Sequence, residues 1–315
     1  MKQYLIKWVE QYLFFPTPFQ QLISILLLPF TVIYCVVAAY KRVSQKPFDF
    51  GIPVISIGNL VVGGSGKTPV TIELTKDQKN IGIVLRGYGR ESKGLQVVSN
   101  KGKILTDVKT SGDEAMLYAK SLPNATVIVA EVREEGILKA KQLGVKTVYL
   151  DDGYSKHGIK KFDILIRPEK EPTNIFCLPS GGYRDTKMLY SFADAVLRDG
   201  VDFKRKVTFS QNGENVEKLP EKLLLVTAIS KADRLLEYLP KDIKTRIFPD
   251  HYSFTKDDIQ KIQSDYEGFD IITTQKDLVK LEQFDISPFV MDLNIEIVNK
   301  EVLERIEKYK DNYNV

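Results

Sequence analysis

The chain has 315 residues with 43% hydrophobic and 27% charged side chains, a composition that excludes a disordered protein. Its formal net charge of +4 is too small to indicate nucleic-acid binding, but it is compatible with an anionic substrate or a lipid surface. Two cysteines, Cys35 and Cys177, cannot make a disulfide framework, and no metal-ligand spacing surrounds them.

The N-terminal part contains an uncharged hydrophobic stretch over residues 22–40. As one helix this stretch would be about 28 Å long, close to the roughly 30 Å hydrocarbon core of a bilayer. Lys41, Arg42 and Lys46 follow it, and by the positive-inside rule they place its C-terminal side in the cytosol. We expect a membrane anchor, with Pro29 favouring a kinked helix in one leaflet over a full span. The alternatives are a buried core helix and a cleaved signal peptide.

After residue 47, short apolar runs alternate with helix-compatible segments. Such alternation is typical of a parallel sheet with helices on both faces, so we predict an α/β fold. The predicted strands are Val54–Ile57, Ile81–Leu85, Thr126–Ala130, Thr147–Leu150, Ile164–Ile166 and Ala195–Leu197. Helices are predicted to begin near Lys67, Gly112 and Glu134.

A second alternation follows a mostly polar stretch, Lys204–Lys222, that carries turn signals. Its predicted strands are Leu223–Thr227, Thr245–Phe248, Ile271–Thr273 and Phe289–Leu293, and its predicted helices are Ser230–Tyr238, Lys256–Ser264 and Lys276–Gln283. Lys300–Tyr313 has the pattern of an amphipathic helix. We therefore predict four parts: a membrane-anchoring segment (1–46), a P-loop core (47–205), a smaller α/β domain (206–295) and a C-terminal helix (296–315).

The segment with the most specific chemistry is the glycine-rich turn that follows the strand at 54–57 and ends in Gly66-Lys67-Thr68. Such a turn lets backbone N–H groups approach phosphates, and the helix that follows favours anionic charge at its N-terminus. In this arrangement Lys67 reaches the β- and γ-phosphates, and the Thr68 hydroxyl holds Mg²⁺. The residues predicted to bind the triphosphate are Val61, Val62, Gly63, Gly64, Ser65, Gly66, Lys67 and Thr68. Val61 departs from the usual pattern, which has a glycine there.

Two pairs of adjacent carboxylates stand at element ends. Asp151 and Asp152 follow the strand at 147–150, where an acid of the Walker-B type holds Mg²⁺ directly or through water. Asp113 and Glu114 open a predicted helix. They are either plain helix caps or groups that hold a metal or act as a base.

The sequence contains two histidines, His157 and His251, the side chain best matched to proton transfer near neutral pH. Each is either a functional group or a hydrogen-bonded structural residue. Arg86 and Arg184 lie in glycine-rich loops and suit bidentate contact with phosphate groups, the alternative being flexible polar loops.

Taken together, these motifs resemble the tetraacyldisaccharide 4′-kinase family of lipid A biosynthesis, and the resemblance covers nearly the whole chain. Beyond the hydrophobic N-terminus, the motifs that carry it are Ile57-Gly58-Asn59-Leu60, Gly63 to Pro69, Arg86-Gly87-Tyr88-Gly89-Arg90, Gly112-Asp113-Glu114, Asp151-Asp152-Gly153-Tyr154, Leu178-Pro179-Ser180-Gly181, Phe248-Pro249-Asp250-His251 and Gln275-Lys276-Asp277. Val61 fits the resemblance, since the family's loop has the form Gly-Asn-Leu-x-x-Gly-Gly. Two positions depart from it: Lys156 stands where the family has a histidine, one residue before His157, and Asp185 stands where the family has a glutamate.

The resemblance implies transfer of the γ-phosphate of ATP to the 4′-hydroxyl of an acylated glucosamine disaccharide 1-phosphate, which yields lipid IVA. It implies an enzyme at the cytoplasmic face of the inner membrane of a Gram-negative bacterium, in contact with membrane lipid. Nothing in the sequence indicates a nucleic-acid or obligate protein partner.

The resemblance also assigns roles to residues. Asp113 and His251 form a catalytic dyad, with Lys67 on the transferred phosphate. Mg²⁺ is held by Thr68, Asp151, Asp152 and Glu114. Arg86 and Arg184 contact the substrate.

Two other functions compete with this interpretation. A membrane-tethered P-loop GTPase is suggested by Ser230-Lys231-Ala232-Asp233, which is similar to the guanine-reading Asn-Lys-x-Asp motif. A nucleotide-dependent scaffold without transfer activity is the other. Firm selectivity for GTP would favour the GTPase. An assay with labelled ATP and the lipid acceptor tests the scaffold, because a scaffold would transfer no label to the acceptor.

Overall fold

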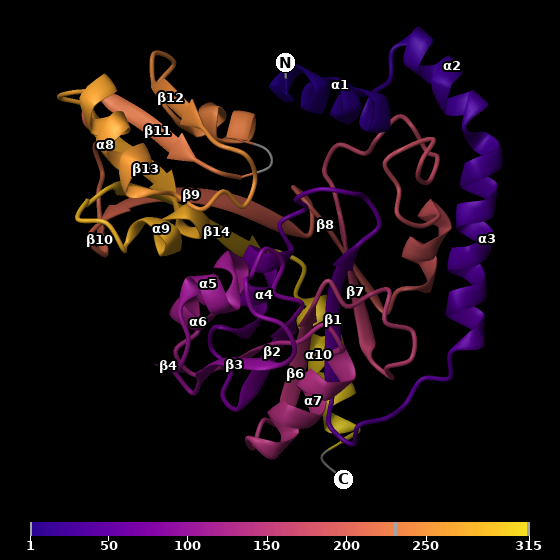
Figure 1. Cartoon of the computed structure of the whole chain (residues 1–315). Helices are drawn as coiled ribbons and strands as arrows, with labels where there is room; N and C mark the ends of the chain where they lie inside the picture. The colour runs from indigo at the N-terminus through magenta and orange to yellow at the C-terminus, as the bar shows by residue number, and fades with distance from the viewer. Residues whose placement is uncertain (1, 230–231, 314–315) are drawn as a thin grey trace. The chain divides into compact units, whose positions relative to one another are not determined.

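The structure is a computed structural model that describes residues 2–229 and 232–313 (Figure 1). It divides into two compact units, each built from segments far apart in the sequence. The first unit comprises Met1–Lys67, Lys146–Lys204 and Ile297–Val315. The second comprises Thr68–Val145 and Arg205–Glu296.

A parallel sheet in the order β6-β1-β7-β8 forms the core of the first unit. Its strands are β1 (Val54–Asn59), β6 (Thr147–Asp151), β7 (Phe162–Arg167) and β8 (Ala195–Arg198). Every residue of β1 is buried, because this strand is paired on both sides. Asn59 and Asp151 close their strands at the carboxyl edge, where open α/β sheets bind their ligands.

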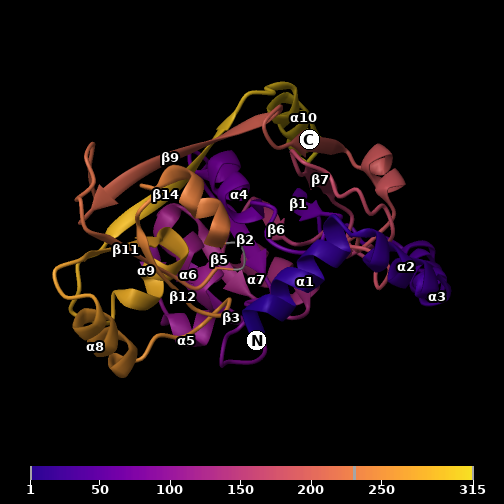
Figure 2. The same cartoon turned by 90° about the horizontal axis from the view of Figure 1, so that it is seen from above.

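The helices of the first unit come from the two ends of the chain and one internal segment. They are α1 (Lys2–Phe14), α2 (Pro18–Leu26), α3 (Leu28–Ser44), the 3₁₀ helix η1 (Lys187–Phe192) and α10 (Glu301–Asp311). A capping box between Thr17 and Gln20 starts α2. The helix is interrupted at Leu27, which lies between α2 and α3. Pro29 lies in the first turn of α3, where its missing N–H costs no helical hydrogen bond. Figure 2 shows α1, α2 and α3 following one another as a continuous indigo run.

The helices α2 and α3 bury polar side chains and expose apolar ones. Thr31 Oγ1 donates a hydrogen bond of 2.7 Å to Ser180 Oγ, and Asn174 Nδ2 donates one of 3.3 Å to Ser24 Oγ. The exposed apolar side chains are Phe19, Leu22, Ile25, Leu26, Phe30, Val32, Ile33, Val36, Val37, Tyr40 and Val43. Within the described part of the chain no single helix is long and apolar enough to cross a membrane. Taken together, α2 and α3 have the length and composition of a membrane-crossing segment, but they are bent by 58° where they meet.

The second unit holds two groups of strands, of which the first has the order β4-β3-β5-β2. These strands are β2 (Ile81–Leu85), β3 (Gln96–Asn100), β4 (Lys103–Ile104) and β5 (Thr126–Val129). β2 and β5 are parallel, whereas β3 runs antiparallel to both β4 and β5. The associated helices are α4 (Lys67–Thr75), which begins at the last residue of the first unit, α5 (Val108–Ser111), α6 (Asp113–Ser121) and α7 (Arg133–Gln142).

The other strands of the second unit form a sheet in the order β10-β9-β14-β13-β11-β12. They are β9 (Phe203–Gln211), β10 (Glu214–Asn215), β11 (Leu223–Thr227), β12 (Lys244–Ile247), β13 (Asp270–Thr274) and β14 (Phe289–Ile297). The 3₁₀ helix η2 (Ala232–Tyr238) and the helices α8 (Lys256–Asp265) and α9 (Gln275–Leu281) accompany this sheet. β11, β12, β13 and β14 pair in parallel, and β9 pairs antiparallel with β10.

The predicted α/β fold with a parallel sheet is confirmed, and the largest differences from the sequence-based prediction concern two strands. The antiparallel strand β3 was not predicted, and β9 lies partly in the polar stretch after residue 204. Several β9 residues are exposed or half-exposed, so the strand lacks the continuous apolar run that marked the others.

Candidate active site

The predicted phosphate loop leaves the carboxyl end of β1 and enters α4 at Lys67. A neighbouring segment holds it: the Val62 N–H donates to the Gly182 carbonyl at 2.9 Å, and the Arg184 N–H donates to the Leu60 carbonyl at 2.7 Å. Gly66 has φ +86°, a backbone conformation that favours glycine.

Val61, the residue that departs from the usual glycine, is buried in a hydrophobic cluster. The cluster includes Phe14 from α1, Leu165 from β7 and Tyr183. The side chain at position 61 therefore anchors the start of the loop to the core. A glycine there would lose this contact.

A charged cluster stands beside the loop. Lys67 Nζ donates to Asn59 Oδ1 at 3.2 Å and lies 3.6 Å from Asp152 Oδ1. Arg184 Nη1 lies 3.1 Å from each carboxylate oxygen of Asp152. Burial alone would raise the pKa of Asp152, but the charges of Lys67 and Arg184 outweigh it and hold that pKa below its ordinary value. We call Lys67, Asp152 and Arg184 the phosphate-loop cluster.

A pocket of about 310 Å³ adjoins this cluster in the first unit. Its lining includes Asn59, Asp152 and Arg184, together with Tyr34 and Val37 of α3. The pocket therefore joins polar groups at the sheet edge to α3, whose exposed side chains are mostly apolar but include Lys41, which also lines the pocket.

His157 and Asp185 also line this pocket. Burial, followed by the charges of Lys161 and Arg42, lowers the pKa of His157 to about 4, so its imidazole is neutral at pH 7. Asp185 forms an ion pair with Arg42 of α3. Asp185, which departs from the family pattern, and His157, which follows the departing Lys156, thus both line the pocket.

The second unit brings together two residues 138 positions apart in the chain, Asp113 and His251. Asp113 is the first residue of α6 and its side chain is 5% exposed. His251 lies in the loop after β12, and its Nδ1 is 3.1 and 3.0 Å from the two carboxylate oxygens of Asp113. The Tyr88 ring stacks obliquely against His251, with ring centroids 4.9 Å apart.

The backbone around this pair is constrained on both sides. Gly112 caps α6 with φ +85°, and a β-carbon there would lie 3.0 Å from the Tyr88 carbonyl oxygen, so position 112 requires glycine. His251 itself has φ +58°, a conformation rare outside glycine, and its N–H donates to the Ala228 carbonyl at 3.2 Å. Asp152 in the first unit shares this feature, with φ +53°.

The two partners shift each other's pKa in opposite directions. Burial would raise the pKa of Asp113, but its hydrogen bond with His251 and the charges of Lys276, His251 and Lys280 bring it below the ordinary value. The hydrogen bond with Asp113 raises the pKa of His251, against smaller opposing effects of burial and Lys276. The fold therefore favours the ionised carboxylate of Asp113 and makes the imidazole of His251 more basic.

Two lysines of α9 complete the surroundings. Lys276 Nζ lies 3.3 Å from Glu114 Oε1 and 3.9 Å from both Asp113 Oδ2 and Asp250 Oδ1. Lys280 Nζ lies 3.7 Å from Asp113 Oδ2. No local sequence pattern assigns a role to these lysines or to Asn59, although Asn59 and Lys276 lie in motifs that carry the family resemblance.

The four predicted magnesium ligands fall in different units. Asp151 ends β6 in the first unit and Asp152 follows it, while Thr68 and Glu114 are the second residues of α4 and α6 and belong to the second unit. Among residues 2–229 and 232–313 no group of three or more His, Cys, Asp or Glu side chains is arranged to hold a metal ion. Magnesium commonly uses one or two carboxylates together with water and substrate phosphates, so the buried Asp151 and its neighbour Asp152 form a suitable donor set.

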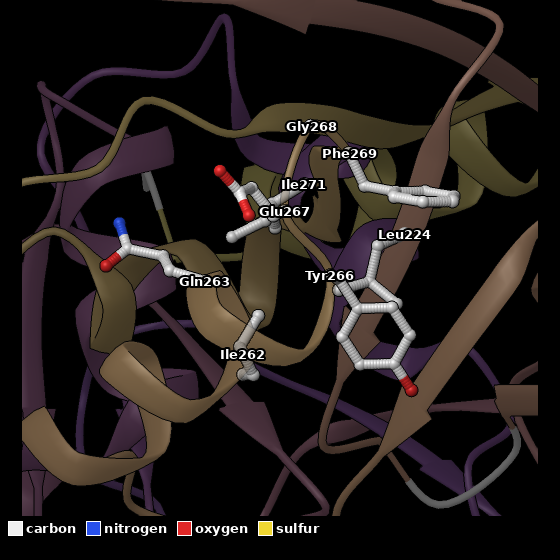
Figure 3. A pocket seen from close by; sticks show the side chains of 8 residues that line it. All are labelled: Leu224, Ile262, Gln263, Tyr266, Glu267, Gly268, Phe269 and Ile271. Carbon is white, nitrogen blue, oxygen red and sulfur yellow. The ribbon is translucent and has the colours of Figure 1, made fainter.

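The remaining predicted residues are more exposed or not described. Arg86 is exposed directly after β2. Ser230 and Lys231 of the GTPase motif lie outside the described residues. A separate pocket of about 240 Å³ in the second unit is lined largely by apolar side chains such as Leu224, Ile262 and Phe269, and none of the predicted site residues lines it (Figure 3).

Comparison with known proteins decides the family. A family model described as tetraacyldisaccharide-1-P 4′-kinase matches residues 23–310. The chain belongs to this family. A tetraacyldisaccharide 4′-kinase from Aliarcobacter butzleri is 57% identical over 298 residues, covering 94% of this chain and 95% of the relative. The Helicobacter pylori relative of the same name is 42% identical over 303 residues, covering 96% and 94% of the two chains.

A solved structure agrees with the sequence relatives. The crystal structure of the "apo" form of LpxK from Aquifex aeolicus in complex with ATP superimposes with a TM-score of 0.72 at 28% identity, covering 91% of this chain and 99% of the other. Membership of the tetraacyldisaccharide 4′-kinase family confirms the predicted enzyme class, a kinase of lipid A biosynthesis.

Proposed function

We propose that residues 61–68 hold the triphosphate of ATP and that Lys67 contacts its γ-phosphate. The glycine-rich turn at the carboxyl end of β1 and the helix that starts at Lys67 form a site suited to phosphate oxygens. Asp152 pairs with both Lys67 and Arg184 in the structure, and an entering triphosphate competes with Asp152 for these two cations. The Aquifex aeolicus relative in complex with ATP supports this assignment.

Mg²⁺ belongs beside this triphosphate, held by Asp151 and Asp152 with Thr68 and Glu114 as further oxygen donors. When bound, the ion neutralises charge on the phosphates as the γ-phosphoryl group leaves. The carboxylates at the end of β6 supply the hard oxygen ligands that magnesium prefers.

The Asp113–His251 pair removes the proton of the acceptor hydroxyl. A sugar hydroxyl is a weak nucleophile at neutral pH, and a positioned base lowers the barrier to its attack. The 4′-oxygen forms a bond to the γ-phosphorus, the bond from that phosphorus to the β,γ-bridging oxygen breaks, and the hydroxyl proton passes to the pair. The observation that carries this proposal is the contact of 3.0 Å between His251 Nδ1 and the buried Asp113 carboxylate.

The acceptor head group is a disaccharide 1-phosphate, and its anionic charge fits the arginines of the site. Arg184 reaches the pocket beside the loop, and Arg86 is exposed after β2. The arginine guanidinium suits bidentate contact with a phosphate, so both side chains are assigned to acceptor binding.

The helices α2 and α3 associate with the membrane from the cytoplasmic side. Their polar residues Gln20, Ser24 and Thr31 are buried, whereas their apolar side chains point outward, which is the reverse of a water-exposed helix. Lys41 and Arg42 in the last turn of α3 favour anionic lipid. We infer that the acceptor's acyl chains lie beside α3 while its sugar stays in water.

Membrane association can be tested by flotation with vesicles that contain anionic lipid. The double substitution Phe30→Ser/Val36→Ser removes two exposed apolar side chains of α3. It should weaken binding by up to about 10³-fold, because full burial of each such side chain contributes about 2 kcal/mol. Leu303→Ser on α10 is the control, since this residue is apolar and partly exposed but lies on another helix. Equal flotation of both variants and the unsubstituted protein would remove α3 from the membrane contact.

Transfer itself is tested with ATP labelled in the γ-phosphate and tetraacyldisaccharide 1-phosphate as acceptor. The proposal expects labelled lipid IVA with ATP, little product with GTP, and none after chelation of Mg²⁺. Efficient transfer from GTP but not ATP would contradict the nucleotide assignment, and undiminished transfer in a chelator would contradict the magnesium assignment.

A further inference from the structure

A buried ion pair lies within α9, between Asp277 and Lys280. Lys280 Nζ is 2.8 Å from Asp277 Oδ1, and the side chains of Lys280 and Asp277 are 7% and 0% exposed respectively. Taking two charges out of water costs several kcal/mol for each ion, so a buried pair is weak evidence for stability alone. The contacts on either side of this pair point to another role.

On one side, Asp277 fixes the strand end that supports His251. Asp277 Oδ2 accepts hydrogen bonds from Thr227 Oγ1 at 2.6 Å and from the Ala228 N–H at 3.0 Å. The carbonyl of that same Ala228 accepts the His251 N–H at 3.2 Å. A single residue therefore connects the Asp277 carboxylate to the backbone of the dyad histidine.

On the other side, Lys280 faces the dyad carboxylate. Its Nζ lies 3.7 Å from Asp113 Oδ2, too long for a hydrogen bond but within ion-pair range, and it also lies 5.5 Å from the Phe254 ring centroid. The side chain is held between Asp277, Asp113 and this aromatic ring, so the position of its charge is fixed.

We propose that the Asp277–Lys280 pair positions the Asp113–His251 dyad: Lys280 orients the Asp113 carboxylate while Asp277 holds the loop that carries His251. These are positioning residues, because neither is assigned to the substrate or to the transferred phosphate. The inference rests on the proposed role of the dyad. It gives a function to Asp277, which the sequence marked only as part of a motif, and to Lys280 just beyond it.

The test compares steady-state transfer in Lys280→Met, in Asp277→Asn/Lys280→Met and in the control Lys120→Met. The double substitution removes both charges, so it leaves no unpaired buried ion if the single variant fails to fold. Lys120 is a matched control, since it lies on α6, the helix of Asp113, and pairs with Glu282 near the protein surface. Circular dichroism checks that each variant is folded.

Loss of Lys280 should lower kcat about 10- to 100-fold, the range found when groups that orient metal ligands are removed. The KM values for ATP and acceptor should change by less than about threefold, because neither residue is assigned to ATP or to the acceptor. The double variant should be similarly slow, and Lys120→Met should match the unsubstituted protein.

Lys280→Met is then combined with Asp113→Ala in one protein. If Lys280 acts through Asp113, Lys280→Met should change the residual rate by less than about twofold in that background. A full and independent loss there, or an unchanged kcat in folded Lys280→Met or in the double variant, would overturn the inference. If Asp113→Ala itself kept the original rate, the dyad assignment would fail instead, so the two failures are distinguishable.

Discussion

The phosphate-loop cluster of the first unit and the dyad of the second use similar groups, a carboxylate beside cationic side chains, but differ in exposure. Asp152 and Arg184 are 47% and 39% exposed, whereas Asp113 is 5% exposed. Exposed ion pairs contribute about 0–1 kcal/mol, so the first cluster can exchange partners when a charged ligand enters. Separating buried charges costs several kcal/mol, so the second keeps its geometry. The difference suits one cluster to ligand binding and the other to proton transfer.

The largest effect should come from the ligand-binding side. Lys67→Ala removes the cation assigned to the γ-phosphate, and it should lower transfer by about 10³-fold or more, because stabilising the charge of the transferring phosphoryl group usually contributes most to catalysis in such sites. The label-transfer assay measures this loss. Lys76→Ala is the control, since Lys76 follows α4 directly and pairs with Glu73 at the surface. Near-normal transfer in Lys67→Ala would refute the phosphate-loop role.

Asp113→Ala and His251→Ala should come next, each lowering kcat by about 10²- to 10⁴-fold as expected for loss of a general base. ATP affinity, measured by equilibrium binding, should stay within about threefold, because these residues belong to the dyad and not to the loop. Loss of ATP binding along with turnover in either variant would contradict the division of roles between the two clusters.

A smaller effect is expected for Arg184→Ala. A hydrogen bond to a charged group contributes about 1.5–3 kcal/mol, so the KM for the acceptor should rise roughly 10- to 100-fold. Initial rates at varied acceptor concentration give this value. Arg198→Ala on β8 serves as the control, as its residue is exposed. An unchanged acceptor KM would remove Arg184 from the substrate contact.

The smallest effect concerns proton binding within the dyad. The pKa of His251 should lie above 6.5 in the unsubstituted protein, since the Asp113 hydrogen bond raises it. In Asp113→Asn this pKa should fall, because burial and Lys276 lower it and only the smaller effect of the Asp250 charge still opposes them. NMR titration of the imidazole signals measures both values.

The same shift has a consequence for stability. With its pKa raised in the fold, His251 contributes stability that is fully present below pH 6.5 and is lost as pH rises through the folded value. The difference in unfolding free energy between the unsubstituted protein and Asp113→Asn should therefore be larger at pH 6 than at pH 9. An equal or smaller difference at pH 6 would contradict the charged pair.

The buried strands could be predicted from the sequence because each is a short, continuous apolar run. Ile81–Leu85 and Leu223–Thr227 were predicted with the bounds that the structure shows. β3 and β9 could not be predicted, because their mixed polarity gives no continuous apolar run. The break between α2 and α3 followed from Pro29, although the chain turns two residues earlier, at Leu27.

The site could be predicted only in part. The order of residues from β1 to Lys67 is local, so spacing alone indicates a phosphate loop. The contact between Asp113 and His251 depends on how the second unit folds, and no local pattern joins residues so far apart; only family resemblance suggested it. Lys280 could not be identified at all, because its role depends on a side chain that approaches Asp113 from another helix.

The most direct test of the division between the two clusters is a single-turnover measurement. Protein in excess is loaded with γ-labelled ATP and Mg²⁺, mixed with tetraacyldisaccharide 1-phosphate and quenched at short times. We predict that His251→Ala binds ATP as the unsubstituted protein does but forms labelled lipid IVA at least about 100-fold more slowly. Product formation at the original rate would show that the dyad does not take the proton, and the account of the active site would be wrong.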